Sequence, residues 1–524
     1  LWGEADMLPA IEIRKPKSIL AKETITAMQA GLGVAKKVNM LAHCMARGMA
    51  QGVLPLIGYN FASGDHKRMK KAAFTAAMVS VALALVCMAV CLGFSAQLIG
   101  LFIQHGSESV SAGASFLRIL CIGGPFSAFA YMVVSFFQAT GHGGKSLLLA
   151  VIGTRPITDG VSIAAAHIDS PRLDLKPNPL YEDHQLAYFD THYYGGIKKY
   201  QWTTIPLALH GVIVRKDGST VTVRIGEDET DPVFCVTDLL PHLGGEQMKR
   251  PANQIVKGED LNLLIGSRPL NGDEGSEMVK LNIMSILHKK YGIVEDDFLS
   301  AELEIVPAFR ARDLGFDRSM IAGYGHDDRV CAYPALTAIL RTGTPAYTAV
   351  TILADKEEIG SDGNTGMKSS FLPYFIDDLA AMFGEKGHHV LSRSVCLSAD
   401  VNAAFDPIYP EVMESRNCAY LNKGVAITKY TGAGGKSGTS DASAELMGMV
   451  RRLMDEQQVL WQVGELGKVD AGGGGTVAKY IANLDVETVD MGVPVLSMHA
   501  PFEVISKLDV FMAHRAFYTL MNRK

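Results

Sequence analysis

Acidic and imidazole side chains follow four separate apolar runs of the sequence, each of which is typical of a buried strand. The runs and the residues after them are VSIAAA (161–166) with His167 and Asp169, AVTILA (349–354) with Glu357 and Glu358, SVCLSA (394–399) with Asp400, and VPVLSM (493–498) with His499. In an open α/β sheet, ligands bind in the crevice outside the carboxyl ends of the strands. We therefore expect these side chains to meet at one edge of a sheet.

A fifth acidic residue, Asp327, begins a helical stretch in GYGHDDRVCAYPALTAIL. Taken singly, each of these residues has an ordinary explanation: a histidine at a strand end is usually a hydrogen-bonded edge residue, and a Glu-Glu pair is usually solvated. Taken together, carboxylates placed directly after buried strands are costly unless they are paired or bind a metal. Two histidines and three carboxylates suit two zinc ions that share one aspartate. Manganese or cobalt suits the same oxygen and nitrogen ligands.

The elements that must position these residues begin near residue 150. From there, short strand-like runs alternate with helical stretches and glycine-rich turns, which is typical of an α/β fold. Residues 172–318 differ, because they hold alternating segments such as LALHGVIVRK and GSTVTVRIGE. The sequence therefore predicts an α/β domain formed by residues 150–171 and 319–524, with a β-rich insertion at 172–318.

Residues 1–149 are predicted to form an apolar, all-α segment of the transmembrane type. The stretches from Ala72 to Ser107 and from Ile119 to Gly141 contain no Asp, Glu, Lys or Arg. They are long enough to cross the ~30 Å hydrocarbon core of a bilayer. The basic HKRMKK run at 66–71 favours a cytoplasmic position for the loop that carries it. The alternative is a set of buried helices in a soluble domain.

The net charge and the cysteine content exclude several classes of protein. The 524 residues carry a formal net charge of −6, which argues against a nucleic-acid partner. The eight cysteines form no CxxC pair, so neither a disulfide scaffold nor a thiolate zinc finger is expected. This cysteine usage fits a reducing, cytoplasmic compartment for the C-terminal part of the chain.

The motifs around the candidate ligands resemble a known family. HIDSPRLDLKPNPLYED, HYYGGIKKYQW, GHDDRVCAY, DKEEIGSDG, SADVNAAFDP and SMHAPFEV are similar to the aspartyl aminopeptidase and aminopeptidase I family of dizinc exopeptidases. This resemblance covers about residues 150–524. It implies a phosphorylase/hydrolase-like α/β catalytic domain, an inserted β-rich dimerisation domain, and homo-oligomers that are commonly tetrahedral dodecamers. It also implies peptide substrates, cleaved at the N-terminus.

The resemblance assigns a role to each candidate residue. It implies that His167 and Asp400 bind one zinc ion, that Glu358 and His499 bind the other, that Asp327 bridges both, that Asp169 orients His167, and that Glu357 is the general base. The peptide bond after Asp327 is expected to be cis. The family often has a histidine where this chain has Asp406, so no preference for an acidic N-terminal residue is predicted.

Two further features are candidate substrate contacts. In DAGGGGTVAKY (470–480), consecutive glycines let backbone N–H groups approach a ligand closely, and the resemblance places this segment at the active site. We expect Gly474 and Gly475 to contact substrate; the alternative is a plain turn before a helix. Lys423 resembles a family position near the substrate, and the alternative is an ordinary surface lysine.

The N-terminal segment has a resemblance of its own. GMAQGVLPLIGYNFASGDHKRMKKA and FFQATGHGGKSLLLA are similar to the MATE family of cation-coupled multidrug antiporters, over about residues 20–149. The aminopeptidase family has several helices at this place. The alternative function is therefore a membrane antiporter fragment for xenobiotic efflux, with an inactive or passenger peptidase half. The candidate ligands also fit an inactive metal-binding protein or a soluble dizinc deacylase.

Overall fold

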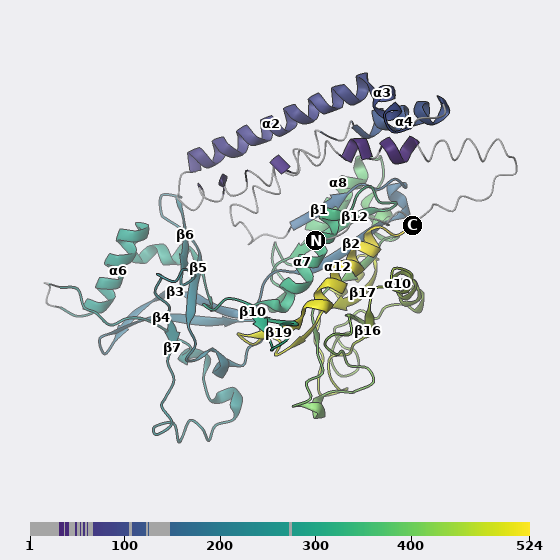
Figure 1. The fold of residues 1–524 in the computed structure, drawn as a ribbon. Helices are drawn as coiled ribbons and strands as arrows, with labels where there is room; N and C mark the ends of the chain where they lie inside the picture. The colour runs from purple at the N-terminus through teal and green to yellow at the C-terminus, as the bar shows by residue number, and fades with distance from the viewer. Residues whose placement is uncertain are drawn as a thin grey trace. The chain divides into compact units, whose positions relative to one another are not determined.

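The computed structural model describes residues 66–103, 107–121, 147–271 and 275–524, together with residue 124 and scattered positions between 31 and 60. The chain divides into two compact units, Leu1–Gly144 and Lys145–Lys524. Both units are drawn in Figure 1.

The C-terminal unit is built on a seven-stranded sheet with the order β1-β12-β2-β13-β17-β15-β16. Its strands are β1 (Leu147–Val151), β2 (Val161–His167), β12 (Thr348–Ala354), β13 (Val395–Ser398), β15 (Val425–Thr428), β16 (Trp461–Val463) and β17 (Glu487–Gly492). The four central strands β12, β2, β13 and β17 are parallel, whereas β1 and β15 run antiparallel to their neighbours β12 and β17.

Helices cover both faces of this sheet. Every residue of β2 and β12 is buried, as expected for parallel strands with helices on either side. One core contains Ala164 and Ala166 of β2 with α7 (His326–Arg341), α10 (Ala444–Glu456) and α12 (Lys507–Met521). The opposite core contains Ile163 and Ala165 with α8 (Phe371–Ala381), α9 (Gly387–Leu391) and α11 (Ala478–Ala482). The expected α/β fold is confirmed.

A second sheet of five strands has the order β10-β11-β19-β18-β14. Its strands are β10 (Arg312–Leu314), β11 (Met320–Gly323), β14 (Asn402–Ala403), β18 (Pro494–Leu496) and β19 (Glu503–Ser506). β14 follows Asp400, and the connection from β18 to β19 contains His499. This sheet therefore takes part in positioning two of the candidate ligands.

The third sheet is antiparallel, in the order β6-β5-β9-β3-β4-β8-β7, and it is formed by residues 172–307. Its strands are β3 (Arg172–Asp183), β4 (Leu186–Tyr194), β5 (Leu207–Val214), β6 (Thr220–Ile225), β7 (Cys235–Val236), β8 (Leu263–Gly266) and β9 (Ala301–Pro307). α6 (Met278–Tyr291) packs against its core, which includes the fully buried Trp202. We call this part the inserted sheet.

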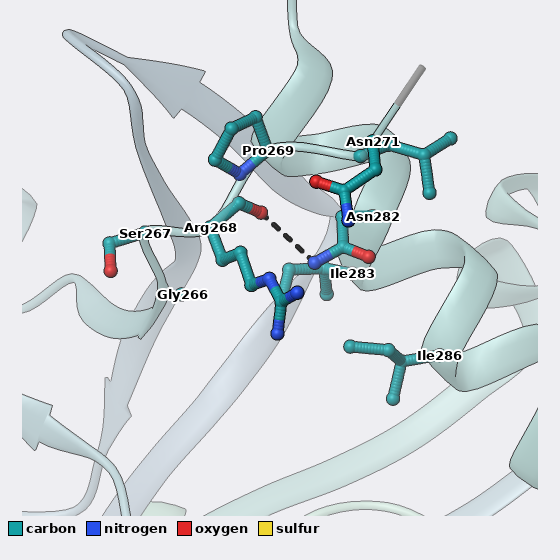
Figure 2. Close-up of a pocket in the computed structure, with 9 residues that line it drawn as sticks. Gly266, Ser267, Arg268, Pro269, Asn271, Asn282, Ile283 and Ile286 are labelled. Atoms are coloured by element: carbon teal, nitrogen blue, oxygen red, sulfur yellow. Dashed lines mark hydrogen bonds between the residues drawn. The ribbon is translucent and has the colours of Figure 1, made fainter. Parts of the chain in front are cut away.

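An open pocket of about 490 Å³ lies between β8, the loop after it and α6 (Figure 2). In it, the side chain of Asn282 donates a 2.9 Å hydrogen bond to the carbonyl of Arg268. None of the described residues that line this pocket is His, Cys, Asp or Glu. The described lining residues therefore offer no carboxylate, imidazole or thiol.

In the N-terminal unit, the structure describes α2 (His66–Gly93), α3 (Ser95–Gly100) and α4 (Ser107–Leu120). Among the described residues, one helix, Lys67–Gly93, is long and apolar enough to cross a membrane, and 22% of its most apolar window is buried. This supports the predicted membrane segment only weakly, because the test rests on length and composition. The second expected span, 119–141, lies outside the described residues except for positions 119–121 and 124.

Candidate metal centre

The structure brings the five candidate ligands together. His167 Nε2 lies 3.2 Å from Asp327 Oδ1 and 3.8 Å from Asp400 Oδ1. His499 Nε2 lies 3.1 Å from Asp327 Oδ2 and 3.7 Å from Glu358 Oε1. These residues form two groups that share Asp327: His167 with Asp400, and Glu358 with His499. Within each group the ligand atoms lie within 4.8 Å of one another. Asp327 contributes a different oxygen to each group.

Three of these residues come from neighbouring parallel strands. His167 ends β2, Asp400 lies two residues after β13, and Glu358 lies in the 3₁₀ turn Glu357–Ile359 that follows β12. These strand ends meet at the carboxyl edge of the central sheet, where an open α/β sheet binds ligands. Asp327 enters from the first turn of α7, and its peptide bond to Asp328 is cis, as expected.

His499 reaches the site from a different sheet, and here the sequence interpretation was wrong. The run 493–498 is not a strand of the central sheet, because β17 ends at Gly492 and β18 belongs to the five-stranded sheet. Gly492 permits the chain to pass closely beside Asp400: a Cβ at this position would lie 1.7 Å from the Asp400 carbonyl oxygen. His499 then adopts a φ of +63° in the connection to β19.

Buried, unpartnered oxygens indicate that a cation fits this site. Among the described residues, Asp327 Oδ1 and Glu358 Oε1 are buried carboxylate oxygens that no donor meets in hydrogen-bond geometry, although His167 Nε2 and His499 Nε2 lie 3.2 and 3.7 Å from them. Such oxygens are costly to bury unless a positive charge faces them. Carboxylate oxygens and imidazole nitrogens are the ligands of protein-bound zinc. The donor set and its unmet oxygens therefore fit zinc.

The electrostatics of the site lead to the same conclusion. Burial and the neighbouring Asp400 raise the pKa of Glu357 to about 8. Burial and Asp327 raise the pKa of Glu358 to about 9. Burial opposes charge on Asp327 as well, but the imidazoles of His167 and His499, 3.2 and 3.1 Å from its two oxygens, hold its pKa below the usual range. Without a cation, the two glutamates favour protonation, so a metal ion has to compete with protons here.

Both imidazoles are oriented through their Nδ1 atoms. His167 Nδ1 lies 3.1 Å from the carbonyl oxygen of Asp169, and His499 Nδ1 lies 2.7 Å from that of Gly196. A carbonyl oxygen can only accept, so each Nδ1 carries a proton, and Nε2 is the atom that faces the carboxylates and would bind a metal after losing its own proton. Asp169 also accepts hydrogen bonds from the amides of Glu357 and Glu358, at 3.1 and 3.2 Å.

Comparison with known proteins agrees with this geometry. The family model described as "Aminopeptidase I zinc metalloprotease (M18)" matches residues 135–520. The chain belongs to the M18 aminopeptidase family. It is therefore a zinc-dependent aminopeptidase, a metallopeptidase that hydrolyses peptide bonds. A second family model, MatE, matches residues 26–158, which agrees with the resemblance of the N-terminal part.

Relatives of this M18 aminopeptidase match it over most of their own length. A probable M18 family aminopeptidase 1 from Clostridium acetobutylicum is 54% identical over 383 residues, which is 72% of this chain and 82% of the relative. The Thermotoga maritima protein of the same name is 49% identical and covers 71% and 84%. The crystal structure of aminopeptidase I from Clostridium acetobutylicum has a TM-score of 0.70 and 52% identity, covering 72% of this chain and 83% of that one.

Three residues that the sequence analysis did not single out make hydrogen bonds to the candidate ligands or to Asp169. The hydroxyl of Tyr194 donates to Asp169 Oδ2 at 2.9 Å, and Gly196 supplies the carbonyl described above. Both lie in HYYGGIKKYQW, within or just after β4 of the inserted sheet. Glu503 accepts hydrogen bonds from the amides of Asp327 and His499. Its signals in the sequence were its position four residues after His499 and its place in the SMHAPFEV motif.

The structure places one of the candidate substrate contacts, Lys423, relative to the metal centre. In the described chain, no hydrogen bond or ion pair joins Lys423, Gly474 or Gly475 to those ligands. Lys423 is exposed just before β15, whose Ala426 pairs with Gly492 at the end of β17 beside Asp400. Gly474 accepts a 2.6 Å hydrogen bond from the Gly432 amide. Lys423 therefore lies at the same edge of the sheet as the metal centre.

Proposed function

We propose that this M18 aminopeptidase removes N-terminal residues from peptides with two zinc ions and Glu357 as the general base. The observation that carries the proposal is the pair of ligand groups that share Asp327. His167 and Asp400 would hold one zinc ion, Glu358 and His499 the other, and Asp327 both. Zinc in this position would polarise the scissile carbonyl and lower the pKa of the attacking water.

Glu357 is suited to carry the proton of the attacking water to the leaving amine. It lies with Glu358 and His167 in a group whose ligand atoms are within 4.8 Å of one another. Asp169 holds the amides of both glutamates. Glu358 also lies in the group with Asp327 and His499, whereas Glu357 does not, so Glu358 is the ligand and Glu357 the base. Glu357 accepts a proton from the attacking water, the carbonyl carbon gains the water oxygen, and Glu357 returns the proton to the leaving amine as the C–N bond breaks.

The substrate and assembly assignments belong to the same proposal. The cationic α-amine of the peptide binds beside the carboxylates, which restricts cleavage to the N-terminus. Lys423 and the backbone of Gly474 and Gly475 contact the substrate. Residues 150–171 and 319–524 form the catalytic domain, and residues 172–318 form a dimerisation domain of a cytoplasmic homo-oligomer. One structural neighbour is described as the yeast mApe1 dodecamer; at 19% identity and a TM-score of 0.57 it shows the fold alone.

The test is hydrolysis of aminoacyl-p-nitroanilides by the full chain. We expect chelation to abolish turnover, added zinc to restore it, and Glu357→Gln to remain inactive with zinc. Turnover that survives both chelation and this substitution would overturn the mechanism. N-acylated substrates separate an aminopeptidase from a deacylase, because blocking the α-amine removes the charge that the carboxylates bind.

A second function concerns the N-terminal unit. Its MatE match and the exposed apolar residues of α2, such as Phe74 and Val86, favour insertion into a membrane. This insertion would associate the peptidase half with the membrane. Sedimentation of the full chain with lipid vesicles tests it, and a chain that stays in the supernatant contradicts it. Proton- or sodium-driven efflux of a dye would favour the antiporter alternative.

A further inference from the structure

We propose that Glu503 is a positioning residue of the metal centre, which sets the separation of Asp327 and His499 before any metal binds. The proposal rests on the proposed function, because it takes these two residues as zinc ligands. Glu503 itself touches the backbone of the ligands and not their ligating atoms.

The contacts of Glu503 join two segments that are far apart in the sequence. Its Oε1 accepts a 2.8 Å hydrogen bond from the amide of His499. Its Oε2 accepts a 3.2 Å hydrogen bond from the amide of Asp327. The side chain is fully enclosed, since Glu503 is only 1% exposed. One carboxylate therefore ties both backbones to a single point.

Both ligands need such a tie, because neither lies on regular backbone. His499 has a left-handed φ of +63°, and Asp327 has a non-helical φ of −79° and ψ of 109° although it lies in the first turn of α7. A buried amide without an acceptor is costly, and the first amides of a helix have no acceptor within the helix. Glu503 supplies the acceptor for both amides and so stabilises these two unusual conformations.

Glu503 is itself fixed without help from a metal. It begins β19 and pairs with Gly323 of β11, while β19 also pairs with β18, the strand just before His499. Asp169 likewise accepts hydrogen bonds from two backbone amides, those of Glu357 and Glu358. Two buried carboxylates, each on a sheet-anchored segment, thus hold the backbones of three of the five ligands and the proposed base.

The chemistry of a carboxylate matters here. It offers an acceptor oxygen to each of the two amides, whereas glutamine offers one oxygen and an NH₂ group that faces the second N–H donor. Glu503→Gln therefore keeps the size of the side chain and removes one of the two ties. Asp509→Asn is a matched control, because Asp509 is equally buried and accepts from the amides of Asn422 and Gly424 at 2.8 Å each.

The experiment measures zinc affinity of the full chain by competition with a chromogenic chelator, for the unaltered chain, Glu503→Gln and Asp509→Asn. We expect Glu503→Gln to weaken zinc binding by about 10- to 100-fold. We expect its kcat to fall at limiting zinc and to recover in excess zinc, with KM unchanged. Asp509→Asn is expected to bind zinc like the unaltered chain, although it loses a tie of the same kind.

The outcomes are distinguishable. If the unaltered chain binds no zinc, the proposed function fails; if it binds zinc and Glu503→Gln binds equally tightly, or Asp509→Asn loses as much affinity, the positioning role fails. Should Glu503→Gln not fold, amide hydrogen exchange of the unaltered chain decides. We expect peptides covering His499 and Asp327 to be protected equally with and without zinc. Fast exchange in the chelated chain would contradict a site that is set before metal binds.

Discussion

The hydroxyl of Tyr194 donates a 2.9 Å hydrogen bond to Asp169 Oδ2, so a side chain of the inserted sheet supports the candidate metal centre at the edge of the central sheet. Tyr194 is buried at the end of β4, and the guanidinium of Arg172 stacks over its ring at 3.8 Å. The neighbouring Gly196 carbonyl orients His499. The inserted sheet is thus part of the structure that positions the ligands, in addition to any role in assembly.

Removing that hydroxyl should affect turnover more than substrate binding. Tyr194→Phe removes one of the two donors to Asp169 Oδ2 and leaves the Glu358 amide, and the loss of a hydrogen bond to a charged group costs about 1.5–3 kcal/mol of stability. Because Asp169 holds both glutamate amides, we expect kcat to fall about 10-fold or more, with KM little changed. Steady-state kinetics of the full chain measure this. Tyr193→Phe is the control, since Tyr193 is 40% exposed on the same strand; an equal loss of kcat there would contradict the assignment.

Glu357 and Glu358 should respond differently to the same substitution. Glu357→Gln removes the proposed base, so we expect kcat to fall by about 10²- to 10⁴-fold while zinc content is unchanged. Glu358→Gln removes a ligand, so we expect loss of zinc as well as activity. Metal analysis after dialysis, combined with turnover assays, separates the two. Loss of zinc in Glu357→Gln, with zinc retained in Glu358→Gln, would exchange the two roles.

Gly492 should tolerate no side chain. A Cβ at this position would lie 1.7 Å from the carbonyl oxygen of Asp400, so the backbone that carries this ligand has to move. We expect Gly492→Ala to destabilise the chain by about 1–3 kcal/mol or more and to weaken zinc binding. Gly448→Ala in α10 is the matched control, because a methyl group there would meet no atom within 4 Å beyond the backbone of its own helix. Equal urea midpoints for the two variants would contradict the argument.

The sequence predicted the centre better than it predicted the elements around it. His167, Glu358 and Asp400 could be placed because a buried parallel strand is a continuous apolar run, and the first polar residue after the run marks the end of the strand. His499 was assigned to the wrong sheet, since 493–498 is largely apolar and the one signal against a central strand, Pro494, was not used. Tyr194 and Glu503 were missed because they act through hydrogen bonds to Asp169 and to backbone amides. Such contacts depend on long-range packing that periodicity does not record.

The stability of the chelated protein should fall as pH rises. Glu357 and Glu358 have ordinary pKa values of 4.5 that burial and neighbouring carboxylates raise to about 8 and about 9. Between pH 4.5 and the raised pKa values, the folded chain holds more protons than the unfolded chain, so the free energy of unfolding decreases as pH rises. Burial lowers the pKa of His499, but its contact with Asp327 outweighs this and raises it from 6.5 to about 10, so that stabilisation is lost between those two pH values.

Bound zinc should reverse this trend, because its ligands have to be deprotonated and a cation then replaces the missing protons. We expect the thermal midpoint of the chelated chain to fall from pH 5 to pH 9, and the increase in midpoint caused by zinc to grow over the same range. Differential scanning calorimetry at pH 5, 7 and 9, with chelator or with zinc, measures both. A chelated chain that becomes more stable towards pH 9 would show that these carboxylates are ionised without a metal. The cation would then not be needed to hold them together.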